Sequence, residues 1–121
     1  MNQNLKTFLK VYNNRGQIKN MIVMYEYLAD IDLPVPFTDD FLSLVPRQRA
    51  MVNKLMNEGV ISSYALSIES GKLWINIIAE SEDNVRTLID SFPIAEHIFY
   101  NVHRLTFHNS INMKIPDFSV N

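Results

Sequence analysis

The sequence lacks several residue types and patterns on which whole classes of protein depend. It has no cysteine among its 121 residues, which excludes disulfide scaffolds, thiolate zinc sites, iron–sulfur clusters and cysteine nucleophiles. It has only three glycines, and it contains no phosphate-binding glycine loop, dinucleotide fingerprint, EF-hand or nucleophile elbow. No apolar run approaches the roughly 20 residues that a membrane-spanning helix needs, and residues 1–16 lack the apolar stretch of a secretion signal. We therefore expect a cytoplasmic protein with no membrane partner.

Charge is unevenly distributed along the chain. Of the net charge of −2, residues 1–25 carry +4, with four basic residues and no acidic one, and the remainder carries −6. The negative balance argues against nucleic acid as a partner. Four apolar residues of the basic stretch repeat at helical spacing: Leu5, Phe8, Leu9 and Tyr12. This pattern predicts a short basic amphipathic helix within an extension over residues 1–19, either docked on its own domain or a neighbouring subunit, or partly disordered.

The first half of the remaining chain predicts a strand followed by a helix. Residues 21–28, MIVMYEYL, are rich in β-branched and aromatic residues and predict a strand. Residues 30–37 contain two prolines and predict an extended connection. Thr38 is a predicted N-cap of a helix that runs up to Gly59. Pro46 lies inside this helix, and it predicts either a kink or a second helix that begins there.

The second half predicts a hairpin, a helix and a last strand. Residues 60–69 and 72–80 are two strand-like runs joined by serine and Gly71, which is typical of an antiparallel hairpin. Residues 81–93 begin with an N-cap serine and carry an apolar helical stripe. Residues 98–107 predict the final strand.

The order of the elements is β, α, β, β, α, β, which is the ferredoxin-like arrangement of the α+β class. We assign this domain to residues 20–108 and an irregular tail to residues 109–121. A sheet with one solvent-exposed face would alternate apolar and polar residues along each strand. Residues 73–78, however, read LWINII and carry apolar side chains on both faces. We therefore expect a homodimer, alone or within a larger ring, in which two antiparallel four-stranded sheets close into an α+β barrel.

The chain contains three segments that read PRQRAMVNKLMNEGVISSYALS, GKLWINIIAESEDNVRTLIDSFPI and LTFHNS. With the Glu58 and Gly59 ending of the first helix, the Ser-Phe-Pro-Ile ending of the second and a histidine just after the last strand, the chain resembles the muconolactone isomerase family of dimeric α+β barrel proteins. The resemblance covers roughly residues 21–110. It departs from the family at the N-terminal extension and at Pro46.

This resemblance implies a homo-oligomer with a pocket for a small organic molecule. It also implies proton transfer between carbons of an unsaturated lactone, without a metal or an organic cofactor. Related barrels include heme-degrading oxygenases and proteins without known activity, so the resemblance is more specific for the fold than for the reaction. A noncatalytic ligand-binding or oligomeric assembly module is the alternative function.

Glu26 and His103 are the candidate catalytic residues. Glu26 is the only charged residue of the predicted first strand. If it faces the covered side of the sheet, desolvation raises its pKa toward that of a general base at neutral pH; alternatively it pairs with a basic residue such as Arg104 or Lys72. His103 lies at the centre of the predicted last strand, a position from which an acid or base can point inward; a hydrogen-bonded structural role is its alternative.

The candidate substrate-binding residues are Asn76, Trp74, Tyr64, Tyr100 and Arg47. Asn76 is an amide in an otherwise apolar strand, so it needs hydrogen-bonding partners across an interface or on a ligand. Arg47 suits a substrate carboxylate because guanidinium binds carboxylates bidentately, and a solvated helix face is its alternative role. The spacing of the three histidines matches no familiar zinc pattern, so we expect no metal site.

Overall fold

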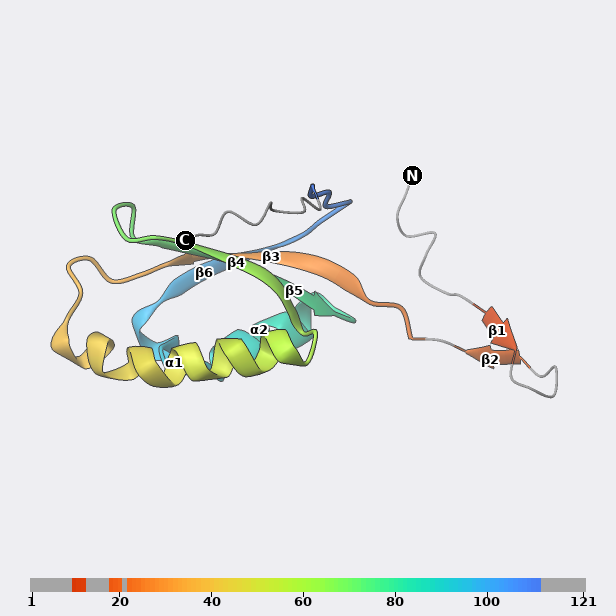
Figure 1. Cartoon of the computed structure of the whole chain (residues 1–121), viewed down its shortest axis with the longest axis horizontal. Helices are drawn as coiled ribbons and strands as arrows, with labels where there is room; N and C mark the ends of the chain where they lie inside the picture. The colour runs from red at the N-terminus through yellow and green to blue at the C-terminus, as the bar shows by residue number, and fades with distance from the viewer. Residues whose placement is uncertain (1–9, 13–17, 21, 112–121) are drawn as a thin grey trace, which may run out of the picture.

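Two helices lie on the same face of a four-stranded antiparallel sheet (Figure 1). The computed structural model describes residues 10–12, 18–20 and 22–111. In chain order the elements are β1 (Lys10–Tyr12), β2 (Ile18–Asn20), β3 (Tyr25–Asp32), α1 (Asp39–Asn57), β4 (Ile61–Ser67), β5 (Lys72–Ala79), α2 (Glu82–Asp90), the short 3₁₀ helix η2 (Ala95–His97) and β6 (Phe99–Arg104). From β3 onward they follow the predicted βαββαβ order, and the strands lie in the order β4-β5-β3-β6. The ferredoxin-like α+β fold is therefore confirmed.

Both ends of α1 follow from local sequence signals. Thr38 Oγ1 accepts a hydrogen bond from the backbone N–H of Phe41 at 3.1 Å, which satisfies one of the free donors at the start of the helix. Two aspartates in the first turn favour the positive end of the helix dipole. Gly59 follows the C-cap residue with a φ of +77°, a conformation that glycine adopts without strain. These predicted boundaries are confirmed to within one residue.

The helix α1 runs through Pro46 without interruption, so the second helix, one of the two alternatives predicted at that residue, is wrong. A proline removes only one backbone donor from the helix. Phe41 lies before Pro46, Val52 lies after it, and both are buried on the side of the helix that faces the sheet. Packing on both sides of the proline thus keeps the two halves in one helix.

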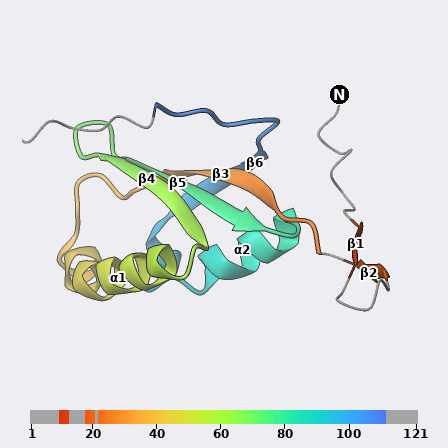
Figure 2. The ribbon, with the colours of Figure 1, turned by 45° about the vertical axis from the view of Figure 1, so that its right-hand side comes forward.

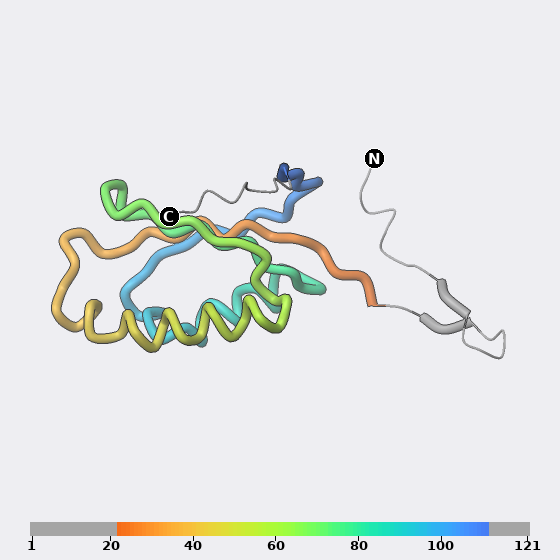
Figure 3. Tube along the Cα trace, viewed as in Figure 1, coloured from red at the N-terminus to blue at the C-terminus, as the bar shows by residue number. Residues whose placement is uncertain are grey.

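The β4–β5 turn and the connection from β3 to α1 lie together at one end of the sheet (Figure 3). Gly71 adopts a φ of +65° in the turn, which favours glycine. The backbone N–H of Leu33 donates to the Gly71 carbonyl at 2.9 Å. A Cβ on Gly71 would lie 2.6 Å from Val35 Cγ2, so the connection packs directly on the glycine. The predicted hairpin is confirmed, and the turn also anchors the entry to α1.

The strands alternate between a buried face and a partly exposed face. Ala29, Ile31, Ile75 and Ile77 point toward the helices and are fully buried, where Val85 and Ile89 of α2 pack with them in one core. Their neighbours along β3 and β5 are only partly buried. We call this second face, formed by the outward residues of β3, β4, β5 and β6, the open face.

The open face is covered by no helix or strand of the described chain. Residues 105–111, which follow β6, run along the side of the sheet away from the helices (Figure 2). The backbone N–H of Leu105 donates to the Glu26 carbonyl at 2.9 Å, which holds the start of this segment against β3. Phe107 has 74% of its surface exposed, since β6 ends at Arg104 and not at residue 107 as predicted.

β3 begins and ends four residues later than the sequence predicts. The expected strand covers residues 21–28, whereas β3 is Tyr25–Asp32. Asp30 and Asp32 lie on the open face, and Lys72 Nζ contacts their carboxylates at 3.1 and 2.6 Å. Both residues fall within the connection that the two prolines of residues 30–37 predict, and aspartate is a residue type depleted in strands. A cross-strand lysine, 42 positions away from Asp30, makes them compatible with the sheet.

The predicted N-terminal helix is also wrong where the structure describes it. Lys10–Tyr12 and Ile18–Asn20 pair as antiparallel strands, with Val11 opposite Lys19. The intervening sequence contains two asparagines and a glycine, which are residue types typical of turns, and the prediction took them only as a helix stop. Leu5, Phe8 and Leu9 lie outside the described residues.

Candidate functional site

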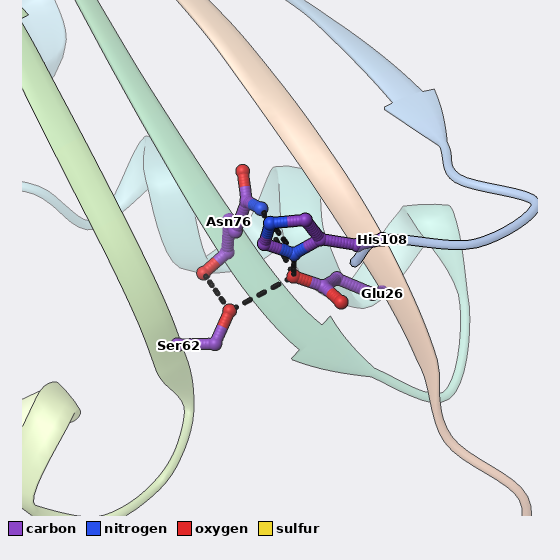
Figure 4. A network of polar contacts seen from close by, with 4 residues as sticks. All are labelled: Glu26, Ser62, Asn76 and His108. Carbon is purple, nitrogen blue, oxygen red and sulfur yellow. Dashed lines mark hydrogen bonds and ion pairs between the residues drawn. The ribbon is translucent and has the colours of Figure 1, made fainter. Parts of the chain in front are cut away.

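The carboxylate of Glu26 is the centre of a polar cluster on the open face (Figure 4). Glu26 Oε2 contacts His108 Nδ1 at 2.9 Å and accepts hydrogen bonds from Asn76 Nδ2 at 2.9 Å and from Ser62 Oγ at 3.0 Å. Its side chain is 22% exposed, and that of His108 is 35% exposed. We call these four residues the Glu26 cluster.

Four different segments supply the cluster. Glu26 lies on β3, and Asn76 lies on the adjacent strand β5, where it pairs with Leu28 two residues along from Glu26. Ser62 lies at a register shift of β4 between Ile61 and Ser63. A bulge of this kind redirects a side chain out of the regular alternation, and here the Ser62 hydroxyl reaches Glu26 across β5.

The contacts of His108 Nδ1 determine which ring nitrogen carries the proton. Glu26 Oε2 only accepts hydrogen bonds when ionised, so Nδ1 must be protonated to donate to it. Asn76 Nδ2 also lies 3.2 Å from Nδ1, but an amide N–H and a ring N–H cannot bond to each other. The arrangement therefore has Nδ1–H donating to Glu26, with the Asn76 amide donating to the same carboxylate.

In neutral His108 this leaves Nε2 unprotonated and able to accept a proton. No described residue forms a hydrogen bond with Nε2. A carboxylate that fixes one ring nitrogen and leaves the other as a base is the same arrangement that orients histidine in hydrolase triads. The Glu26 cluster thus has the geometry of an oriented acid–base pair.

The environment lowers the pKa of Glu26, which corrects one of the two predictions for this residue. Burial raises the pKa of Glu26, but hydrogen bonds from His108, Ser62 and Asn76, together with attraction to His108, outweigh burial and bring the pKa below its ordinary value. The prediction of a pKa raised by desolvation assumed an apolar environment and is wrong. Glu26 is therefore suited to remain an ionised carboxylate that orients His108.

The partner predicted for Glu26 in the alternative interpretation is also wrong. Lys72 pairs with Asp30 and Asp32, and the Arg104 guanidinium lies over the Tyr25 ring at 4.7 Å from its centroid. Glu26 is paired, as that interpretation expects, but with a histidine that follows the sheet.

The other predicted site residues are divided between the two faces of the sheet. Trp74 lies on the open face with Asn76. His103 pairs with Leu28 and shares that face, but it makes no hydrogen bond or ion pair with any described residue. Tyr100 lies on the helix side, where its hydroxyl donates to Asp90 Oδ1 at 2.9 Å.

Two predicted residues lie near α1 and away from Glu26. Tyr64 pairs with the buried Ile75, so it points to the helix side, where it lines a pocket beside α1. Arg47 is exposed on α1 and does not line that pocket. Only Glu26 and Asn76 of the predicted residues therefore meet in one site.

Sequence reasoning missed His108 and Ser62. The signal for Asn76 was available, because it is an amide in an apolar strand, and the hairpin register brings it near the first strand. His108 follows the last strand and is one of the features on which the resemblance rests. Its position over the sheet, however, depends on the course of residues 105–107, which the sequence does not predict. Ser62 reaches Glu26 only because of the irregularity in β4.

Among the described residues, no group of three or more histidine, aspartate or glutamate side chains is placed to hold a metal ion. No helix of the described chain is both long enough and apolar enough to cross a membrane. The chain matches no model of a known protein family and no curated protein.

Proposed function

We propose that the protein is a cofactor-independent isomerase that moves a proton between two carbons of a small carbonyl compound. The resemblance to muconolactone isomerases suggests this reaction class. The contact of 2.9 Å between Glu26 Oε2 and His108 Nδ1 is the observation that supports it, since a histidine held in one tautomer by a carboxylate is an efficient proton carrier.

In this proposal His108 is the catalytic acid–base residue. Its Nε2 removes a proton from a carbon beside the substrate carbonyl, and the electrons of the broken C–H bond move onto the carbonyl oxygen as an enolate. The protonated ring then returns the proton to a different carbon of the same molecule, so the reaction is a balanced isomerisation. The ionised Glu26 stabilises the imidazolium that forms between the two steps.

Asn76 supplies a donor for the enolate oxygen. Its Nδ2 carries two hydrogens, of which one is used by Glu26 Oε2 at 2.9 Å. The second is available to the developing oxyanion, a type of interaction that contributes strongly where water is excluded. Ser62 is a positioning residue, because its hydroxyl contacts the Glu26 carboxylate and the backbone carbonyl of Asn76.

A homodimer that covers the open face would exclude water from the Glu26 cluster. Leu28, Trp74 and Ile78 are apolar residues on this face and are partly exposed in the single chain. Phe99 lies on the same face, opposite Asp32, and is 80% exposed. A second copy of the chain, placed sheet to sheet, would bury these side chains and enclose the Glu26 cluster.

Hydrogen–deuterium exchange at carbon tests the reaction without requiring a complete turnover. The purified protein is incubated in D₂O with muconolactone and with unsaturated lactones that lack its carboxylate, and mass spectrometry measures deuterium uptake beside the carbonyl. We expect uptake with the wild-type protein and a fall of roughly 100-fold or more in His108→Gln. His103→Gln is the matched control, because His103 shares the face and contacts no described polar group; it should retain the wild-type rate.

Two results would overturn this assignment. One is the absence of enzyme-dependent deuterium uptake into any of these lactones. The other is a loss of uptake in His103→Gln with full uptake in His108→Gln, which would return the catalytic role to His103.

A further inference from the structure

A second candidate site lies on the other side of the sheet from the Glu26 cluster. It is a pocket of about 460 Å³ between α1 and β4, a volume within the ordinary range for small-molecule sites. Its walls come from the β3–α1 connection, α1, β4 and the residue after it, β5, and Ile94, which lies between α2 and η2. The lining residues are apolar except for Gln48, Arg49 and Tyr64.

The rim of this pocket exposes large apolar side chains to solvent. Leu42 is 48% exposed on α1, and Leu66 and Ile68 are 54% and 65% exposed on and just after β4. β4 is an edge strand, so among the described residues no further strand pairs beside it. Contiguous exposed apolar surface around a concave site is typical of a surface that binds something.

Gln48 shows what kind of molecule the pocket would bind. It is the one buried polar residue among those described, with only 6% of its surface exposed. Its Oε1 accepts a long hydrogen bond of 3.4 Å from the backbone N–H of Ile94. Its Nε2 is buried and has no hydrogen-bond partner in the described chain.

The contact with Ile94 also fixes the orientation of the amide. Were the Gln48 amide flipped, two N–H donors would face each other and Oε1 would lose its partner. The Nε2 donor therefore remains the free group. A buried donor without a partner is unfavourable in the free protein, and a ligand that brings an acceptor into the pocket removes that cost.

We propose that this pocket binds an apolar carbonyl compound whose carbonyl oxygen accepts a hydrogen bond from Gln48 Nε2. The free group is a donor, so the ligand must bring an acceptor. The pocket has one charged residue, Arg49, and it is exposed. A carboxylate at the buried end would lack a counter-charge, so the acceptor beside Gln48 is neutral. Arg49 suits a carboxylate on the exposed end of the same ligand.

The pair 2-acetylnaphthalene and 2-ethylnaphthalene tests the hydrogen bond, because the two molecules differ in size only slightly and in one carbonyl. Titration of the full-length protein, followed by NMR, gives both dissociation constants. We expect the ketone to bind roughly five- to tenfold more tightly than the hydrocarbon, because one buried hydrogen bond contributes a difference in affinity of this size. Gln48→Met keeps the volume and removes the donor, so it should abolish the preference.

Asn53→Leu is the matched control, since it removes an exposed amide from the same helix outside the pocket. This variant should keep the full preference for the ketone. The side-chain ¹⁵NH₂ resonance of Gln48 in the wild-type protein gives a second readout if Gln48→Met does not fold. It should shift when the ketone binds and remain in place with the hydrocarbon.

Equal affinity for the two naphthalenes in the wild-type protein, or no binding of either, would overturn the proposal. So would an unchanged ketone preference in Gln48→Met. If neither compound binds and Leu66→Lys converts a dimer to a monomer in sedimentation velocity, the apolar rim is an interface between two copies and the ligand assignment is wrong.

Discussion

Glu26 and His108 lie 82 positions apart in the sequence, and their side chains meet at 2.9 Å on the open face of the sheet. The contact joins β3 to the segment that follows β6, and it is continued by hydrogen bonds from Ser62 and Asn76 to the same carboxylate oxygen. A single oxygen with three polar partners is strongly stabilised in its ionised form. The cluster therefore affects the stability of the fold as well as its chemistry.

Glu26→Gln should make the stability of the protein less dependent on pH in the acid range. The pKa of Glu26 is lower in the folded state than its ordinary value, so its ionised form stabilises the fold above the ordinary carboxylate pKa of about 4.3, and this stabilisation is lost as the pH falls through the lower folded value. The wild-type protein should thus exceed the variant in unfolding free energy near neutral pH, and the difference should shrink as the pH falls below the ordinary carboxylate pKa and through the lower folded one. Urea unfolding at a series of pH values measures it.

Glu80→Gln is the control for this experiment, because Glu80 is exposed and no described residue forms an ion pair with it. Its difference from the wild-type protein should stay small and constant over the series. A Glu26→Gln difference that grows on acidification would contradict the assigned direction of the shift.

Ser62→Ala should raise the pKa of Glu26 toward its ordinary value. The variant removes the hydroxyl that donates to Glu26 Oε2 at 3.0 Å, which is one of the hydrogen bonds that favour the ionised carboxylate. Titration of the Glu26 carboxyl carbon by NMR measures the change. Ser63→Ala, one residue further along β4, removes a hydroxyl that does not contact Glu26 and should leave the titration unchanged; equal curves for Ser62→Ala and the wild-type protein would exclude a role for the hydroxyl.

Local signals in the sequence were sufficient for most of the fold. Thr38 and Gly59 mark the two ends of α1, and Gly71 lies in the hairpin turn. Each of these signals acts through the residue's own backbone and its nearest neighbours, so it can be predicted locally. The predicted first strand ends before Asp30 and Asp32, because these two residues are compatible with β3 only through Lys72. That ion pair is a tertiary contact, which no local propensity contains.

The candidate site was predictable only in part for the same reason. Glu26 and Asn76 are polar residues in apolar strands, and this anomaly is visible in the sequence. His108 and Ser62 are unremarkable by composition. Their roles depend on the path of the chain after Arg104 and on the register shift in β4, neither of which a local sequence signal predicts.

Gly71→Ala should destabilise the fold more than Gly59→Ala. Both glycines have positive φ angles, of +65° and +77°, and alanine at such a position costs about 1 kcal/mol. A Cβ at residue 59 meets nothing within 4 Å, whereas one at residue 71 would lie 2.6 Å from Val35 Cγ2. The clash should bring the total for Gly71→Ala to about 2–3 kcal/mol in denaturant unfolding.

Val35→Ala separates the two contributions at Gly71. Val35 is 67% exposed, so its own truncation should have a small effect. Combined with Gly71→Ala it should recover the part of the loss that comes from the clash and leave the part that comes from φ. If the losses of unfolding free energy in the double variant are additive, the clash with Val35 does not contribute to the effect of Gly71→Ala.

Trp74 should report whether a second copy of the chain covers the open face. It is the only tryptophan in the sequence, and it lies on the open face of β5 with part of its surface exposed. If two sheets close on each other, its emission should be blue-shifted at high protein concentration and move to longer wavelength on dilution, as the dimer dissociates.

Two variants test which face forms the contact. Ile78→Lys places a charge on the same face as Trp74 and should give the long-wavelength emission at every concentration. Leu66→Lys places the charge on the helix side of β4 and should keep the wild-type dilution curve. Emission independent of concentration, with a monomer mass in sedimentation, would leave the Glu26 cluster exposed to water and remove the enclosure on which the proposed chemistry relies.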